Sequence, residues 1–312
     1  MRVVGLTEFG GPEQLRVLDV PEPHPGPGEV RIRVHAAAVN PADIGTRSAA
    51  WNPNPDWRPP YVLGMDAAGV VSEVGEGAPW NMGDHVMAVV VPWGPGGGAY
   101  ADELVVPAES VVRVPRGMDF VQASTLPMNG LTAVMALATL DLSEGQTVAV
   151  TGSAGAFGGY VTQMAKAQGL RVLADASVAD EALIRSLGAD EVVRRGDDFA
   201  ERIREAVPDG VDAVVDGALQ NGKIERAVRD GGQIFVPSPW IWEAERGVTV
   251  RNALVQTGAR DTARIDYVRE LAEQGALTPR VADVLPAERA GDAHRRLEAG
   301  GVRGRLVLDF SS

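Results

Sequence analysis

The chain has 312 residues, 45% of them hydrophobic, and its 42 acidic and 29 basic side chains give a formal net charge of −13. A single hydrophobic core rarely grows beyond about 250–300 residues, so this length favours two domains. The acidic balance disfavours nonspecific attraction to nucleic acids and anionic membranes, which leaves small molecules as the expected partners. Cysteine is absent, which excludes disulfides, thiolate nucleophiles and zinc sites with sulfur ligands.

Metal, membrane and export signals are weak. The four histidines, His24, His35, His85 and His294, are scattered, and no two have the spacing of a metal-binding helix or turn, so no metal is expected. No apolar run approaches the roughly 18 residues of a membrane span, and the N-terminus lacks the charged-then-apolar layout of a signal peptide. A cytoplasmic location is therefore expected.

The first third of the chain is typical of antiparallel β structure. Short valine-rich segments broken by Gly and Pro run to about Val114, at 30–34, 69–74, 85–91 and 104–106. Segment 51–60 is so rich in proline that it can form neither a regular helix nor a central strand. Segment 94–98 has four glycines in five positions and predicts a second loop.

Strands and helices alternate after Asp119, which predicts a parallel sheet covered on both faces. The expected strands are 148–150, 172–174, 191–193, 213–215 and 233–236, and the expected helices include 179–186, 199–206 and 223–228. A last helix at 261–274 leads through 277–285 and 287–297 to a strand-like segment, 305–310. We expect this C-terminal part to return to the first domain, which gives an α/β chain with one doubly wound and one mainly antiparallel domain.

A glycine-rich turn joins the strand at 148–150 to a helix whose Val161, Met164, Ala165 and Gln168 have helical spacing. Such a turn needs small residues because the backbone bends sharply, approaches a pyrophosphate and packs a helix on the sheet. Gly155 and Gly158 fill two of the three glycine positions of the dinucleotide fingerprint, and Ser153 replaces the first. By itself, the pattern also fits the glycine-rich loop of another doubly wound fold, such as a methyltransferase.

Nine short segments together carry a family resemblance. They are 10–13, 38–43 (Ala-Val-Asn-Pro-Ala-Asp), 63–71 (Leu-Gly-Met-Asp-Ala-Ala-Gly-Val-Val), 83–86, 98–101 (Gly-Ala-Tyr-Ala), 131–133, 153–158, 187–192 and 304–308. In this order they resemble the medium-chain dehydrogenase/reductase superfamily, specifically its zinc-independent quinone oxidoreductase branch. The resemblance implies a GroES-like catalytic domain at 1–118 and 275–312 and a Rossmann dinucleotide-binding domain at 119–274.

The resemblance also implies the chemistry. The positions that hold catalytic zinc in zinc-dependent members are Asn40, Met65 and Thr125 here, and these residues cannot form the usual site. The short loop at 92–98 replaces the lobe that carries structural zinc. Direct hydride transfer from NADPH to a quinone or an α,β-unsaturated carbonyl is therefore expected, because conjugation spreads the incoming charge without a metal.

Two polar residues are expected beside the nicotinamide by the same resemblance. Asn40 and Thr132 would hydrogen-bond the carboxamide or the substrate carbonyl. The alternatives are that Asn40 only caps the turn before Pro41 and that Thr132 bonds back within its helix. Gly45 stands where some relatives carry a tyrosine, so solvent is the expected proton source. Tyr61 and Tyr100 lie near candidate loops, but packing roles are favoured for both.

The expected cofactor contacts come from the glycine-rich turn and from the ends of the strands. They are Ser153, Gly155, Ala156, Phe157, Gly158, Ser177, Arg194, Arg195, Ala218, Val236, Ser238 and Arg305. The acid that binds ribose hydroxyls in NAD-preferring enzymes would align with Ala176, and Asp175 lies one residue early. Ser177 and the arginine pair suit a 2′-phosphate, which favours NADP(H), with NAD(H) as the alternative.

The sequence leaves the role of one tryptophan pair and the exact reaction open. Trp240 and Trp242 suggest either a pocket wall or a subunit contact, and relatives pair this region across a two-fold axis, so a homodimer is expected. The favoured function is an NADPH-dependent quinone or enone reductase. The alternatives are an enoyl reductase in a biosynthetic pathway and a redox sensor that binds NADPH without turnover.

Overall fold

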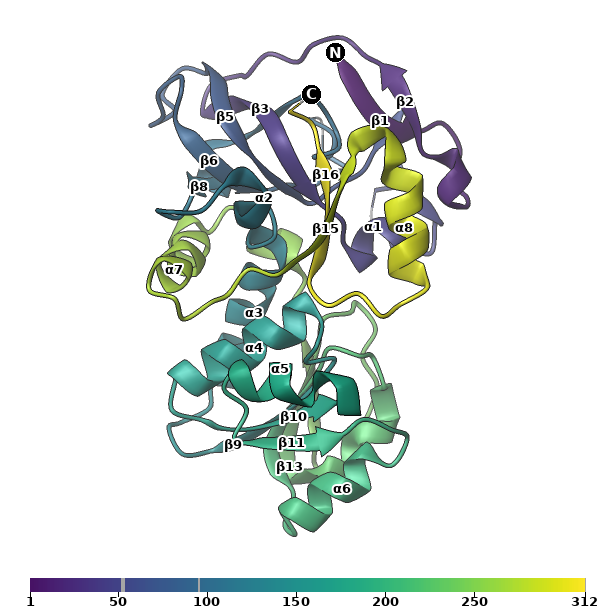
Figure 1. Ribbon diagram of the computed structural model, residues 1–312, viewed down its shortest axis with the longest axis vertical. Helices are drawn as coiled ribbons and strands as arrows, with labels where there is room; N and C mark the ends of the chain where they lie inside the picture. The colour runs from purple at the N-terminus through teal and green to yellow at the C-terminus, as the bar shows by residue number, and fades with distance from the viewer. Residues whose placement is uncertain (52–53, 95, 312) are drawn as a thin grey trace. The chain divides into compact units, whose positions relative to one another are not determined.

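The computed structural model describes residues 1–51, 54–94 and 96–311. The chain divides into two compact units (Figure 1). Unit 1 comprises Met1–Met128, Ala259–Glu273 and Pro279–Ser312, and unit 2 comprises Asn129–Gly258 and Gln274–Thr278. The change from unit 1 to unit 2 thus falls later than residue 118, and segment 259–273 groups with unit 1. Residues 52, 53 and 95 of the two expected loops lie outside the described residues.

Unit 1 is mainly antiparallel. One sheet has the order β15-β16-β3-β5-β6-β8, with β7 also pairing with β3, and a smaller sheet has the order β2-β1-β4. The strands are β1 (Arg2–Leu6), β2 (Arg16–Asp19), β3 (Glu29–Ala38), β4 (Tyr61–Val62), β5 (Asp66–Val74), β6 (His85–Val89), β7 (Glu103–Pro107), β8 (Val111–Arg113), β15 (Val281–Pro286) and β16 (Arg305–Asp309). The pairs of this unit are antiparallel apart from β15 with β16.

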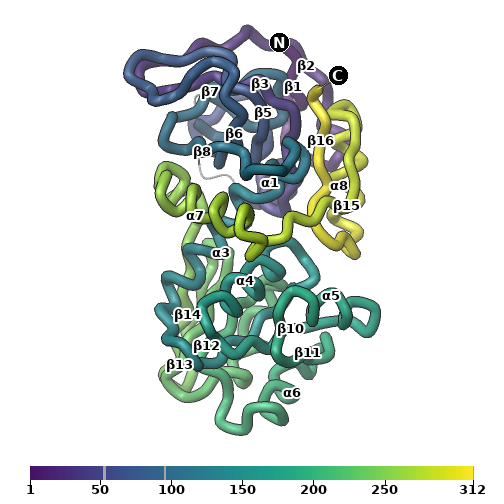
Figure 2. Tube along the Cα trace, turned by 60° about the vertical axis from the view of Figure 1, so that its left-hand side comes forward, coloured from purple at the N-terminus to yellow at the C-terminus, as the bar shows by residue number. Residues whose placement is uncertain are grey.

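The C-terminal part of the chain returns to this sheet, as expected, because β16 pairs with β3 through Val307 and Ala38. Short helices complete the unit, and α8 packs along β15 and β16 (Figure 2). They are η1 (Pro12–Gln14), α1 (Pro41–Arg47), η2 (Ala108–Ser110), α2 (Phe120–Ala123), α7 (Thr262–Glu273), η6 (Ala287–Arg289) and α8 (Ala290–Glu298). The alternation of buried and half-buried positions along β3 shows why its Val30, Ile32 and Val34 form part of the core.

Unit 2 contains a parallel sheet with the order β11-β10-β9-β12-β13-β14. Its strands are β9 (Thr147–Thr151), β10 (Arg171–Ala176), β11 (Glu191–Arg194), β12 (Val211–Asp216), β13 (Val228–Val236) and β14 (Thr249–Asn252). In chain order this is 3-2-1-4-5-6, the doubly wound arrangement of Rossmann domains, whose direction reverses between β9 and β12. The predicted fold class and the five predicted strands are confirmed.

Helices cover both faces of this sheet, with α4 and α5 on one side and α6 on the other (Figure 1). The elements are α3 (Pro127–Leu140), which begins in unit 1, α4 (Ala156–Ala167), η3 (Val178–Asp180), α5 (Glu181–Ser186), α6 (Phe199–Ala206), η4 (Asn221–Ala227) and η5 (Val255–Thr257). The helix expected at 223–228 is the 3-10 helix η4 rather than an α-helix. Crossover helices of this kind are what a parallel sheet requires.

One stretch of the described residues, Phe120–Leu140, is long and apolar enough to cross a membrane by length and composition alone. In the structure, 78% of the 18-residue window is buried, as in the core helix of a globular domain.

Candidate functional site

The carboxyl edge of the parallel sheet gathers most of the residues that the sequence singled out for the cofactor. Strands β9, β10, β11, β12 and β13 end at Thr151, Ala176, Arg194, Asp216 and Val236. The predicted Ser153, Ser177, Arg195, Ala218 and Ser238 follow these ends within two residues. Because neighbouring strands run in the same direction, these segments lie along one edge, where open α/β sheets bind ligands.

The glycine-rich turn is shaped by Gly152 more than by Ser153. Gly152 has φ +69°, a left-handed conformation that favours glycine, whereas the Ser153 hydroxyl donates to the carbonyl of Val150 across 2.9 Å. A Cβ on Gly158 would lie 2.4 Å from the carbonyl oxygen of Gly152. Gly152 was not among the residues predicted from the sequence, although its place directly after the strand was a usable signal.

Helix α4 begins directly after this turn. Gly155 is its N-cap, with φ −76° and ψ 172°, and Ala156 and Phe157 form the start of its first turn. The backbone N–H groups of a first turn have no intrahelical partner and face the positive end of the helix dipole, so they favour an anionic group. The turn therefore has the small residues and the donors that a pyrophosphate needs.

Asp175 is fully buried at the end of β10. Its carboxylate accepts the Ser153 N–H at 2.9 Å. It also accepts Nε of Arg195 at 2.7 Å and Nη2 of Arg195 at 3.3 Å. Asp175, which lies one residue from the position of a ribose-binding carboxylate, is thus hydrogen-bonded to Ser153 and Arg195 of the protein itself.

The other strand-end residues differ in their environment. Ser177 donates its hydroxyl to Asp180 across 2.6 Å, and the carbonyl of Arg194 accepts Arg202. Val236 is fully buried. The Ser238 hydroxyl accepts the Trp240 N–H at 3.2 Å.

A buried hydrogen bond between Thr151 and Asp216, neither of which was predicted from the sequence, fixes the loop after β12. The Thr151 hydroxyl donates to Asp216 across 2.6 Å and accepts the Ala218 N–H at 3.1 Å. The second carboxylate oxygen of Asp216 accepts the N–H of Asn221. This arrangement fixes Ala218 at the end of β12, one of the expected positions. Thr132 lies on α3 and is 6% exposed.

In unit 1, Asn40 lies directly before α1 and is fully buried. Its side-chain Nδ2 donates to Asp66 at 2.7 Å and to the carbonyl of Ala38 at 3.4 Å. Its backbone N–H donates to Asp43 at 2.8 Å. Asn40 therefore precedes a helix as its N-cap, but its side-chain amide is oriented by a second buried carboxylate.

Burial raises the pKa of Asp66 to about 7 and that of Asp43 to about 6. The hydrogen bonds that each carboxylate accepts oppose this rise, and the positive charge of Arg305 opposes it in both cases. Arg305 is 5% exposed. The structure thus brings Arg305, predicted as a cofactor contact, into the electrostatic environment of Asn40 and two acids. Asp43 and Asp66 both lie in segments that carried the family resemblance, but the sequence did not indicate that their side chains are buried.

Asp43 continues into a buried chain of hydrogen bonds. The Tyr100 hydroxyl donates to Asp43 across 3.1 Å and lies 3.3 Å from Nε2 of His294. Nδ1 of His294 lies 3.4 Å from a guanidinium nitrogen of Arg47, which also bonds Glu298. Because an arginine only donates, Nδ1 accepts and Nε2 carries the proton, so the donors run from Arg47 through His294 and Tyr100 to Asp43.

The pKa values of two groups in this chain, His294 and Tyr100, are strongly shifted. Burial, followed by the charge of Arg47, lowers the pKa of His294 to about 3, so the imidazole is neutral at ordinary pH. Burial and the charge of Asp43 raise the pKa of Tyr100 well above its usual range. Tyr100 therefore has a packing and hydrogen-bonding role inside unit 1. Tyr61 stacks on Phe9 with ring centroids 4.4 Å apart.

Comparison with known proteins agrees with this geometry. The model of the alcohol dehydrogenase GroES-like domain matches residues 26–116, and that of the zinc-binding dehydrogenase family matches residues 187–308. A quinone oxidoreductase of Homo sapiens is 28% identical over 330 residues, covering 99% of this chain and 97% of its own. An NADPH-dependent alkenal/one oxidoreductase of Arabidopsis thaliana is 30% identical over 317 residues, covering 97% and 78%.

Solved structures give the same answer. A mycobacterial protein complexed with NADPH has a TM-score of 0.86 and 30% identity, and an NAD-dependent alcohol dehydrogenase has a TM-score of 0.87 and 30% identity. Each alignment covers 99% of both chains. The chain belongs to the medium-chain dehydrogenase/reductase superfamily. It falls in the quinone oxidoreductase-like branch of that superfamily, and it is an oxidoreductase.

The superfamily's catalytic zinc positions hold different side chains here. Asn40 bonds Asp66, Met65 is buried, and the Thr125 hydroxyl donates to the carbonyl of Gln122 at 2.8 Å. Within residues 1–51, 54–94 and 96–311, the structure gathers no group of three or more His, Asp or Glu side chains that could hold a metal ion. A Cβ on Gly45, where some superfamily members carry a tyrosine, would lie 3.8 Å from Cβ of Trp51.

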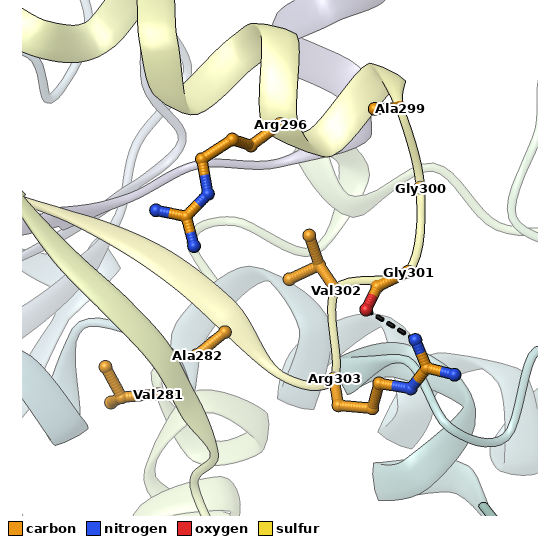
Figure 3. Close-up of a pocket in the computed structure, with 8 residues that line it drawn as sticks. All are labelled: Val281, Ala282, Arg296, Ala299, Gly300, Gly301, Val302 and Arg303. Atoms are coloured by element: carbon orange, nitrogen blue, oxygen red, sulfur yellow. Dashed lines mark hydrogen bonds between the residues drawn. The ribbon is translucent and has the colours of Figure 1, made fainter. Parts of the chain in front are cut away.

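A separate open pocket of about 590 Å³ lies in unit 1, between β15 and the loop after α8 (Figure 3). Arg296 and Arg303 carry its charged groups, and small or branched apolar residues form the rest of its lining. Arg296 pairs with Asp283 at 2.5 Å, and Arg303 donates to the carbonyl of Gly301 at 2.5 Å. The residues predicted from the sequence do not line this pocket.

Proposed function

We propose that this chain is a zinc-independent, NADPH-dependent oxidoreductase that reduces a quinone or an α,β-unsaturated carbonyl. The choice of cofactor rests on the bond between Asp175 and Arg195. This bond occupies the carboxylate that could otherwise bind ribose hydroxyls, and it places a guanidinium group beside the strand ends. Arg195 is 41% exposed. A guanidinium matches the geometry and charge of a phosphate, whereas a ribose diol prefers a carboxylate.

The nicotinamide cofactor would be held along the carboxyl edge of the sheet in unit 2. The glycine turn and the first turn of α4 would bind the pyrophosphate, and Ser177, Arg194 and Arg195 the adenosine phosphate. Ala218, Val236 and Ser238 would contact the remainder. When bound, NADPH supplies a hydride to an electron-poor carbon.

Within unit 1, Asn40 and Arg305 are proposed for the reacting end, and Thr132 of unit 2 stays a separate prediction. Asp66 fixes which way the Asn40 amide points, so its Oδ1 can accept a hydrogen bond from a carboxamide NH2, whereas donating to a carbonyl would require Nδ2 to give up its long bond to Ala38. The expected zinc positions supply amide, thioether and hydroxyl groups, a donor set that does not suit catalytic zinc. Conjugation in the acceptor would spread the developing negative charge, and solvent would provide the proton.

Turnover assays separate this proposal from its alternatives. Oxidation of NADPH and of NADH is followed by absorbance with a panel of quinones, short enones and enoyl thioesters, each with and without a chelator. Saturable, chelator-resistant oxidation of NADPH with quinones or enones supports the proposal. Activity with enoyl thioesters alone would favour a biosynthetic enoyl reductase. Binding without turnover would favour a sensor, and loss of activity with the chelator would refute zinc independence.

A matched pair of variants tests the role of Asn40. Asn40→Ala removes the amide, while Asn40→Asp keeps the size but places a third carboxyl beside Asp43 and Asp66. We expect both variants to lower kcat by about 100- to 1000-fold, as for loss of one hydrogen bond to the reacting group. Unchanged kcat in Asn40→Ala would leave Asn40 with only its role before α1.

We also propose that the chain forms a homodimer through the edge of its parallel sheet. Strand β14 ends the strand order and so presents an unpaired edge, which a second copy can extend. In the loop between β13 and β14, Trp240 is 65% and Ile241 55% exposed, whereas Nε1 of Trp242 bonds Glu225 at 2.5 Å. The cytoplasmic location stays a prediction.

A further inference from the structure

Asp175 stands at a junction of three segments within unit 2. It lies on β10, it accepts the backbone N–H of Ser153 in the glycine turn, and it holds the side chain of Arg195 after β11. The Arg195 backbone is also fixed, since its N–H donates to the carbonyl of Ala176 at 2.8 Å. One buried carboxylate therefore connects the turn to the neighbouring strand end.

The two oxygens of the Asp175 carboxylate accept different hydrogen bonds. Oδ1 accepts Ser153 and Nη2 of Arg195, and Oδ2 accepts Nε of Arg195. Asp175 is fully buried, so these partners replace its lost hydration. It could accept a ribose diol only by giving up one of these bonds. Its position one residue before Ala176 turns its side chain to the other side of the strand.

We propose that Asp175 is a positioning residue that selects a 2′-phosphorylated dinucleotide by holding Arg195 in place. This inference rests on the proposed function. A guanidinium has five N–H donors in a fixed plane, and the Nε edge of Arg195 is turned to the carboxylate. Restricting the side chain before the ligand arrives reduces the ordering cost of binding.

The negative charge of Asp175 acts in the opposite direction, because it offsets part of the attraction between Arg195 and a phosphate. Orientation outweighs this effect in our proposal, since a guanidinium recognises phosphate by paired hydrogen bonds as well as by charge. The bond to Ser153 adds a second consequence. Losing the carboxylate altogether should disturb the turn and weaken binding of both dinucleotides.

Two substitutions separate these roles. Asp175→Asn keeps an oxygen that can accept Ser153 and the longer bond from Nη2 of Arg195 at 3.3 Å, but it turns an NH2 group toward Nε of Arg195, so the shorter bond that holds the arginine is lost. Asp175→Ala removes both contacts. Arg195→Gln removes the phosphate-binding group itself, and Arg185→Gln, which breaks an exposed pair with Glu181 on α5, serves as the control for loss of one arginine.

Affinities for NADPH, NADH, 2′,5′-ADP and 5′-ADP would be measured by calorimetry, with thermal unfolding to verify folding. For Asp175→Asn we expect loss of about tenfold in affinity for NADPH and 2′,5′-ADP, the size of one charge-assisted hydrogen bond, with NADH and 5′-ADP little changed. In the Arg195→Gln background, Asp175→Asn should have no further effect on either phosphorylated ligand. Asp175→Ala should weaken all four ligands.

Contrary outcomes are distinct. The positioning role is refuted if Asp175→Asn keeps or increases the preference for NADPH over NADH. It is also refuted if Asp175→Asn lowers this preference by the same factor in the Arg195→Gln background as in the wild type. In both cases the proposed function stands. If the wild-type chain binds neither NADPH nor NADH, the proposed function fails and this inference fails with it. Selective binding of NADH by the wild-type chain would refute the selection of a 2′-phosphate but keep a nicotinamide-dependent enzyme.

Discussion

Asn40 donates its side-chain amide to the buried carboxylate of Asp66 across 2.7 Å. The other oxygen of Asp66 accepts the N–H of Met128 at 2.6 Å. Each oxygen of the Asp66 carboxylate thus accepts one N–H group, and this carboxylate orients the side-chain amide of Asn40. A residue proposed for the reacting end of the site therefore has an orientation that depends on a carboxyl group with a raised pKa.

Asp66 should make unfolding depend on pH near neutrality. Its folded pKa of about 7 lies above the ordinary aspartate value of 3.8, so between these two pH values the folded chain holds a proton that the unfolded chain releases. The group therefore stabilises the fold as pH falls from about 7 toward 4, by about 1.4 kcal/mol for each pH unit. Asp66→Asn should lose this slope in urea unfolding experiments across that range. Parallel curves for variant and wild type would contradict the raised pKa.

His294 should have the opposite effect. Its folded pKa of about 3 lies below the usual 6.5. Between these pH values, the unfolded chain therefore binds a proton that the folded chain does not bind. The stability contributed by the neutral imidazole is lost as pH falls through about 6.5 toward 3. His294→Gln should unfold less steeply with acid than the wild type in the same assay. An unchanged acid slope would mean that His294 is protonated in the fold.

Arg305 should matter most when Asp43 and Asp66 are ionised. Arg305→Met removes a cation that acts on both carboxyls, and breaking a buried charge group typically costs about 3–5 kcal/mol. We expect a loss of that size near pH 8 and a smaller loss near pH 5, where the acids are protonated, with Arg305→Lys as the charge-retaining control. Equal losses of unfolding free energy at both pH values would contradict the coupling.

The glycine turn should tolerate a methyl group at one glycine better than at the other. A Cβ on Gly158 would lie 2.4 Å from the carbonyl oxygen of Gly152, but a Cβ on Gly155 would lie 3.2 Å from the same atom. Gly158→Ala should therefore destabilise the chain by about 1–3 kcal/mol and weaken NADPH binding. Gly155→Ala should have the smaller effect on both. Thermal unfolding and calorimetric titration measure the two, and the reverse order would refute the steric argument.

The proposed dimer can be tested by sedimentation. Replacing Trp240 and Ile241 with Ser should shift the chain to a monomer at micromolar concentration, because aromatic and aliphatic anchors dominate interfaces. Met82 is 72% exposed in unit 1 and gives a matched control, since Met82→Ser should leave the oligomeric state unchanged. A monomeric wild-type chain, or a dimeric double variant, would refute this interface.

The sequence predicted the parallel strands because each is a short apolar run bounded by turn residues, and the glycine turn because its backbone needs are visible in residue type. It did not predict the hydrogen bond between Tyr100 and His294, which lie 194 residues apart. Such a pair is created only when α8 packs against the rest of unit 1. The role of Asp175 was likewise hidden, since the residue type allows a ribose contact and only the position of Arg195 shows another partner. Gly152 was overlooked because attention to the fingerprint fell on Ser153.

The place of β16 bears on how the chain is made. This strand lies between β15 and β3 in the sheet of unit 1, yet it follows every segment of unit 2 in the sequence. Unit 2 lies wholly within the stretch synthesised before it, so the parallel sheet can form while the antiparallel sheet still lacks an interior member. The sheet of unit 1 is completed only after β16 is translated, and until then residues 36–38 of β3, which pair with β16, expose a hydrogen-bonding edge that chaperones or another nascent chain could occupy.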